Sequence, residues 1–274
     1  MNQPKKNATA FSPVTQEELN DWVKEESDFA FEQIIHQDLR KTFGSECQHN
    51  GSYADPHTGL MREFDIRASK TLKSEAKRAM TIRLAVECKN IRCDSVVLLS
   101  CVPRSQKEAY HSVVKAADEQ GSVVNFEYPR SLYQPNQSVA KNCEQVTRQQ
   151  NGNFSSNHEG AYGKWSQALN STADLIHDSC RKYKIGYSHF SAVIPIVVVP
   201  NGRLWYCDYD GSGNRSGDVQ SIDRCSYYVG AEVPATFLRG RSFRVSHIEF
   251  CTRIGLAKLV EKLVTEFEDC LFDF

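Results

Sequence analysis

Two short stretches decide the fold of this chain: REFDIRA at residues 62–68 and LAVECKN at residues 84–90. Turn-forming residues precede the first stretch, and apolar and polar side chains alternate along the second, so each is predicted to be a β-strand. This placement puts Asp65 at the end of one strand. It puts Glu87 and Lys89 on a single face of the next strand, with 21 residues between the two acids.

Other clear patterns surround these strands. A capping box of Thr15 and Glu18 predicts a helix that ends at Gly44, with a break near Ser27 left open. Further strands are predicted at residues 46–53, 95–102, 192–199, 203–208 and 243–251, and further helices at residues 106–120, 162–177 and 255–271. Long apolar runs are typical of strands covered on both faces. The predicted fold class is therefore α/β, a mixed β-sheet flanked by helices.

The composition favours one large domain. The chain has 274 residues, of which 40% are hydrophobic and 24% charged, as is usual in globular proteins. We expect a disordered tail at residues 1–14 and a single domain at residues 15–274. Fifteen of the 27 residues at positions 134–160 are Asn, Gln, Ser or Gly. A polar insertion at about residues 129–160 is therefore expected, as a surface loop or mobile lid.

The sequence also indicates the cellular compartment. No apolar run approaches the ~20 residues needed to cross a bilayer, and the first residues lack the apolar segment of a secretory signal. The ten cysteines contain no C-x-x-C pair, so they are expected to be reduced thiols. We therefore expect a cytoplasmic protein with no membrane partner.

The charges are unevenly distributed. The net charge is −1, but residues 1–61 carry ten acids and five bases, whereas residues 62–92 carry nine bases and four acids. A local basic surface can hold phosphates on a protein that is nearly neutral overall. The candidate nucleic-acid contacts are Arg62 and Arg67 here, and Arg241 and Arg244 in the later stretch RGRSFR. A solvated charged surface is the alternative explanation.

The carboxylates of the two strands suggest a metal site. Asp65 and Glu87 from adjacent strands would converge beside the ammonium group of Lys89. Mg²⁺ prefers oxygen ligands and commonly binds one or two carboxylates together with substrate phosphate. Such an ion can activate water and neutralise charge on a phosphodiester. An exposed Glu-x-Lys pair is otherwise an ordinary surface ion pair, and that alternative stays open.

The order of these elements resembles the PD-(D/E)XK nuclease superfamily. The resemblance covers about residues 29–120, as a helix, the REFDIRA strand, the AVECKN strand, an apolar strand and a helix. It implies a restriction-endonuclease-like core with a polar insertion. The literal Pro-Asp pair of the family motif is absent, because Phe64 precedes Asp65. The assignment therefore depends on spacing and context.

The family motif implies roles for individual residues. Asp65 corresponds to the first acidic metal ligand, Glu87 to the second and Lys89 to the motif lysine, and the Cys88 carbonyl would be a further metal contact. Many members also use a glutamate from the first helix. In this chain Glu32, in FAFEQII, is the best match, and Glu26 is the alternative.

The function that follows is a Mg²⁺- or Mn²⁺-dependent endonuclease that hydrolyses DNA. RNA stays open as a substrate, and the partner protein could be a second copy of the chain or a subunit of a defence system. The competing hypothesis is a catalytically silent nuclease-fold module that binds nucleic acid or a partner protein.

Overall fold

The two decisive stretches form the centre of an antiparallel meander. The computed structural model describes residues 12–25, 27–55, 58–73, 78–117, 120–179, 188–233 and 242–272. Strand β2 (Met61–Lys73) runs antiparallel to β3 (Arg78–Cys88) on one side and to β1 (Cys47–Ala54) on the other. Strand β9 (Ser188–Val199) lies parallel to β3 along the whole of β3. The predicted strands at these positions are confirmed.

A large mixed sheet continues beyond β9. Its order is β1-β2-β3-β9-β13-β12-β7-β4-β10-β11 in the part of the chain that the structure describes. The added strands are β4 (Ser95–Pro103), β7 (Ser138–Arg148), β10 (Leu204–Asp208), β11 (Gln220–Ser221), β12 (Arg224–Val233) and β13 (Phe243–Thr252). A hairpin of β5 (Tyr110–Ala117) and β6 (Gln120–Glu127) pairs with the first half of β9 through β5, and β8 (Phe154–Asn157) pairs with β7.

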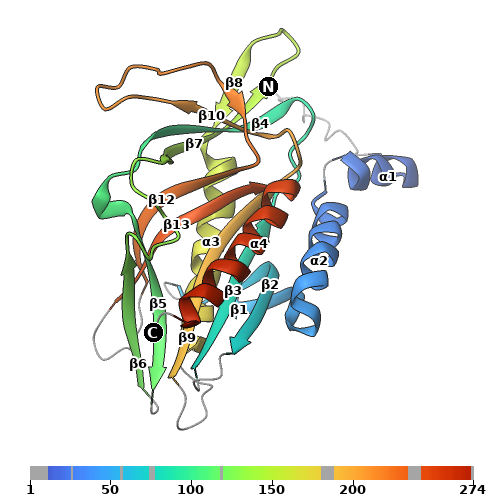
Figure 1. The fold of residues 1–274 in the computed structure, drawn as a ribbon. Coiled ribbons are helices and arrows are strands. Elements are labelled where there is room, and N and C mark those ends of the chain that lie inside the picture. The colour runs from blue at the N-terminus through green and yellow to red at the C-terminus, as the bar shows by residue number, and fades with distance from the viewer. Residues whose placement is uncertain are drawn as a thin grey trace, which may run out of the picture.

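Four helices flank this sheet within the described residues. They are α1 (Gln16–Glu25), α2 (Phe29–Phe43), α3 (His158–Ser179) and α4 (Arg253–Phe272), and two short 3₁₀ turns cover Gly44–Glu46 and Gln106–Glu108. Figure 1 shows α3 behind the sheet and α4 in front of it, with α2 to one side of α4. The α/β class with helices flanking a mixed sheet is confirmed. None of the described helices is long and apolar enough to cross a membrane.

The alternation along β3 explains why helices cover both faces. Ile82 and Leu84 point to the face where α2 and α4 pack, and they are fully buried with Leu263 of α4. Ala85 points the other way and packs with Ile176 of α3. Because both faces of this sheet region are covered, charged residues on β2 and β3 are held in largely apolar surroundings.

The predicted helix at residues 106–120 is wrong. Apart from the 3₁₀ turn at its start, this segment forms β5 and the beginning of the hairpin to β6. Tyr110, Val113, Val114 and Ala117 have the spacing of a helical stripe, but a short apolar run does not separate helix from strand by periodicity. The β-branched pair Val113–Val114 is fully buried in the strand, opposite Ala192 and Ser191 of β9.

The polar segment also differs from expectation. Residues 138–148 are not a loop or lid: they form β7, which lies between β12 and β4. Val139 and Ala140 are fully buried, and the ladder with β4 satisfies their backbone groups. The polar composition favoured a loop because β7 has few apolar side chains. Pairing in a sheet requires only backbone groups, so a strand can form there nonetheless.

The remaining expectations for local structure are mostly confirmed. The Thr15 capping box forms, with Glu18 N–H donating to Oγ1 at 3.3 Å, and the first predicted helix is divided into α1 and α2 around Ser27. Predicted helices at α3 and α4 are present. All eight described cysteines are free thiols. Residues 1–11 of the expected tail lie outside the described residues.

Candidate functional site

The two acids of the motif lie where β2 and β3 stop pairing. The β2–β3 ladder ends at the Ile66–Val86 pair, although β3 itself continues to Cys88. Beyond that pair, the Asp65 carboxylate replaces a backbone acceptor, and its Oδ2 accepts the Cys88 N–H at 2.7 Å. Asp65 is thereby fixed next to Glu87 on the face of the sheet covered by α3. The sequence analysis predicted that these two residues would lie on adjacent strands, and they do.

The ammonium group beside the acids belongs to Lys164. This residue lies in the second turn of α3, and its Nζ donates to Asp65 Oδ2 at 3.0 Å and lies 3.7 Å from Glu87 Oε2. Although burial alone would lower it, the charges of Asp65 and Glu87 raise the pKa of Lys164 above its ordinary value. Lys164 is therefore a fixed cation that offsets part of the negative charge of the pair.

Glu87 has the most unusual environment of the three. It has no exposed surface, and neither carboxyl oxygen has a hydrogen-bond partner in the structure. Burial and the nearby charge of Asp65 raise the pKa of Glu87 to about 9, despite the opposing effect of Lys164. A buried carboxyl without partners is costly, so it is neutral near pH 7 unless a further cation comes close.

A third carboxyl lies within electrostatic range. Glu32, on the first turn of α2, is buried, and its Oε2 lies 3.5 Å from His49 Nε2. Burial and the charge of Asp65 raise the pKa of Glu32 to about 7. A carboxyl with that pKa exchanges protons readily at neutral pH, as a general acid or base must. The first-helix glutamate of the sequence prediction thus lies near the acidic pair, whereas Glu26 is outside the described residues.

Lys89 has a different environment. Its backbone N–H donates to the Val198 carbonyl, and burial lowers the pKa of its side chain while the charge of Asp28 opposes that shift. The lysine that the structure pairs with Asp65 and Glu87 is Lys164. Cys88 contributes its backbone N–H to Asp65, and its side chain is fully buried.

The predicted nucleic-acid contacts are separated from one another. The Arg67 guanidinium is buried, pairs with Asp174 of α3 at 2.7 Å and lies over the Phe64 ring, so its role is to join β2 to α3. Arg62 is half exposed and lies 3.6 Å from Asp55. Arg244 pairs with Glu232 at an exposed position on β13, and Arg241 lies outside the described residues.

The chemistry of the donors limits what metal could bind. In the described ranges, no three His, Cys, Asp or Glu side chains are arranged as a complete metal site. The Asp65–Glu87 pair supplies two carboxylates, and the unpartnered oxygens of Glu87 are the feature a cation would satisfy. This donor set fits Mg²⁺ or Mn²⁺, which retain waters and bind substrate phosphate, better than Zn²⁺, which requires a fuller set of protein ligands.

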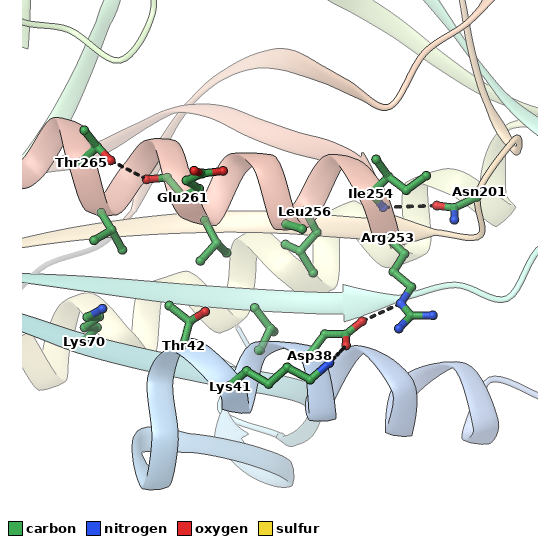
Figure 2. A pocket seen from close by; sticks show the side chains of 14 residues that line it. Asp38, Lys41, Thr42, Lys70, Asn201, Arg253, Ile254, Leu256, Glu261 and Thr265 are labelled. Atoms are coloured by element: carbon green, nitrogen blue, oxygen red, sulfur yellow. Dashed lines mark hydrogen bonds and ion pairs between the residues drawn. The ribbon is translucent and has the colours of Figure 1, made fainter.

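A larger cavity is lined by none of these residues. A groove of about 670 Å³ runs between α2 and α4 (Figure 2). Apolar side chains such as Leu39 and Leu256 line it, and Asp38 closes one end by pairing with Arg253 at 2.5 Å and Lys41 at 2.7 Å. Both Asp38 oxygens are therefore paired.

Comparison with protein-family models, with curated proteins and with solved structures gives no match. Any conclusion about function therefore depends on the geometry of the side chains.

Proposed function

We propose that Asp65, Glu87 and Lys164 form the active site of a Mg²⁺-dependent nuclease that hydrolyses DNA phosphodiester bonds on a restriction-endonuclease-like core. The observation that carries this proposal is Glu87, a wholly buried carboxyl with two unpartnered oxygens beside a second carboxylate. A structural role alone would leave both oxygens without a hydrogen-bond donor, which is costly for a buried polar group.

The topology supports the proposal in a modified form. The meander α2-β1-β2-β3 carries the two acids, and α3 and the parallel strand β9 complete the layer around them. In the sequence analysis, strand 95–102 and a helix at 106–120 were expected to follow β3. Strand β9 takes that place in the sheet, and α3 is the helix whose Lys164 contacts the two acids.

Each residue has a role that its position allows. Asp65 and Glu87 would hold the metal ion, which when bound lowers the pKa of water and neutralises phosphodiester charge. Lys164 would place its ammonium group beside the charge that develops on the phosphate, a contribution usually worth about 100-fold or more in rate. Glu32, with its pKa of about 7, would transfer the proton of the attacking water.

The decisive experiment compares two lysines. Purified wild-type protein, Lys164→Met and Lys89→Met would be incubated with supercoiled plasmid DNA, and separately with RNA, in Mg²⁺, in Mn²⁺ and in EDTA. We expect metal-dependent nicking by the wild type, a loss of about 100-fold or more in Lys164→Met, and a change of only a few-fold in Lys89→Met.

Other outcomes decide against parts of the proposal. Cleavage that disappears only in Lys89→Met would make that residue the acting lysine. Cleavage of RNA alone would change the substrate. Absence of cleavage of either nucleic acid in both metals would refute the nuclease and favour the silent module. Circular dichroism of each variant shows whether a lost activity reflects a lost fold.

A further inference from the structure

A second buried charge, Arg104, lies on another part of the sheet from the acidic pair. Its contacts include none of the residues of that pair. Arg104 follows the end of β4 and is only 2% exposed. It lines a cavity of about 230 Å³ together with Arg224 at the start of β12 and Lys262 of α4. Three cationic side chains from three elements therefore meet at one cavity.

The polar contacts of Arg104 in the described residues are with neutral groups. Its Nε donates to His247 Nε2 at 3.2 Å and its Nη1 to the Gln134 carbonyl at 2.9 Å, while the Tyr133 ring lies 5.2 Å from the guanidinium carbon. Within the described part of the chain, Arg104 forms no ion pair, and its Nη2 makes no hydrogen bond. Burial and the charge of Arg104 lower the pKa of His247 to about 3, so the imidazole is neutral.

The nearest buried acid is already fully engaged. Glu249 accepts from Arg224 Nε at 2.7 Å and from the Ser226 hydroxyl at 2.9 Å. Although burial would raise it, the Arg224 guanidinium lowers the pKa of Glu249 to about 2, so this pair is charged and internally neutral. Glu249 thus pairs with Arg224. Burial lowers the pKa of Arg104, and the charge of Glu249 opposes that shift without an ion pair. Arg224 also lines the cavity, and its Nη groups make no hydrogen bond in the described residues.

A buried, unpaired guanidinium is unfavourable unless an anion accompanies it. Its planar set of N–H donors matches the oxygens of phosphate and carboxylate groups. Lys262, 37% exposed, adds a cation at the rim, where its Nζ also lies 3.4 Å from Glu266 Oε1 on the same helix. One acid, Asp208, also lines the cavity, and the Ser138 hydroxyl donates to its Oδ1. Asp208 forms no ion pair with Arg104 in the described residues.

We propose that this cavity binds a phosphate group, either as free phosphate or as the phosphomonoester of a small hydroxylated molecule, with Arg104, Arg224 and Lys262 as its donors. The volume is below the range of about 300–1,000 Å³ that is usual for drug-sized ligands, which favours a small molecule. The depth of Arg104 excludes the backbone of a nucleic-acid duplex as the ligand.

The test is calorimetric titration of the full chain with inorganic phosphate and, separately, with ribose 5-phosphate. We expect the wild type to bind at least one of the two probes, and Arg104→Met to lose affinity by about tenfold or more. In phosphate-free buffer, Arg104→Met should melt at the wild-type temperature or higher, because the substitution removes an unpaired buried charge. Tighter binding of ribose 5-phosphate than of phosphate would identify a phosphomonoester as the ligand.

Two further variants keep the proposal falsifiable. Lys262→Gln changes a half-exposed side chain on α4 and should weaken binding several-fold without affecting folding. Arg148→Met is the matched control, because β7 is 11 residues long and Arg148 lies about 30 Å from its Ser138 end. Failure of the wild type to bind either probe at millimolar concentration would overturn the proposal. So would equal binding by wild type, Arg104→Met and Lys262→Gln.

Discussion

Replacing Glu87 by Gln should stabilise the metal-free protein, by an amount that depends on pH. The pKa of Glu87 is about 9 in the folded protein and 4.5 ordinarily, so between these values the folded state retains a proton that the unfolded state has released. Wild-type stability therefore falls as pH rises through this window. Glutamine has the same shape and does not ionise, so Glu87→Gln removes this fall in stability.

The size of the effect follows from the two pKa values. In the unfolded chain, pH 7 lies about 2.5 units above the pKa of Glu87. At 1.36 kcal/mol per unit, release of this proton stabilises the unfolded state by about 3 kcal/mol. Near pH 5 the same calculation gives less than about 1 kcal/mol. The amide, like the neutral carboxyl, is buried without partners, so that cost largely cancels in the comparison. We expect Glu87→Gln to exceed the wild type by about 2–3 kcal/mol at pH 7.

Urea unfolding in EDTA at pH 5 and pH 7 measures this difference directly. Glu63→Gln, at an exposed position on the same strand as Asp65, is the control and should show no pH-dependent change. Excess Mg²⁺ should stabilise the wild type by ligand linkage and should affect Glu87→Gln much less. If Glu87→Gln is less stable than the wild type by the same amount at both pH values, Glu87 is ionised and held by Lys164, and the reasoning from burial is refuted.

Two other predictions concern the packing of the scaffold and its sensitivity to acid. A Cβ at Gly255 would lie 1.8 Å from the Asp223 carbonyl oxygen, so Gly255→Ala should destabilise the protein by about 1–3 kcal/mol or more in urea unfolding. At the control position Gly163 a Cβ meets nothing within 4 Å, so Gly163→Ala should be neutral or stabilising. Equal changes in unfolding free energy for the two variants would contradict this prediction. Burial lowers the pKa of His111 to about 3, so wild-type stability should decline as pH falls below the ordinary value of 6.5, and His111→Gln should decline less steeply, by up to about 1.4 kcal/mol per pH unit. Parallel pH profiles for the two proteins would show that His111 is not the group responsible.

The sequence predicted the centre of the fold better than its periphery. The REFDIRA and AVECKN strands and the apolar run at β9 have patterns that only a covered sheet explains, and all three were predicted at the correct positions. At residues 106–120 the apolar spacing agreed with a helix, and the pairing with β9 that decides for a strand is a contact between distant segments. Local propensity contains no information about such a contact.

The acidic pair and its lysine differ in the same way. Asp65 and Glu87 are neighbours because their strands are, and adjacent strands could be inferred from the sequence. Lys164 lies 99 residues from Asp65, so no local spacing connects them. One signal was present: Lys164, Gln167, Ser171 and Asp174 form a polar stripe at helical spacing. All four of these residues contact residues of β2. A polar stripe on one face of a helix that covers a sheet indicates that this face meets polar groups of the sheet.

Both proposed sites are exceptions to the rule that buried ionisable groups are paired, one with an acid and the other with a base. Glu87 is a buried acid whose oxygens lack partners, and Arg104 is a buried base without an acid. Two other buried charges in the described core are paired closely, Arg67 with Asp174 and Glu249 with Arg224, each at 2.7 Å. The cation beside Glu87 lies at 3.7 Å, and Arg104 has no ion pair in the described residues. We propose that a ligand of opposite charge stabilises each group, a cation at Glu87 and an anion at Arg104. Since the two groups share no contact residue, one ligand can be tested without the other.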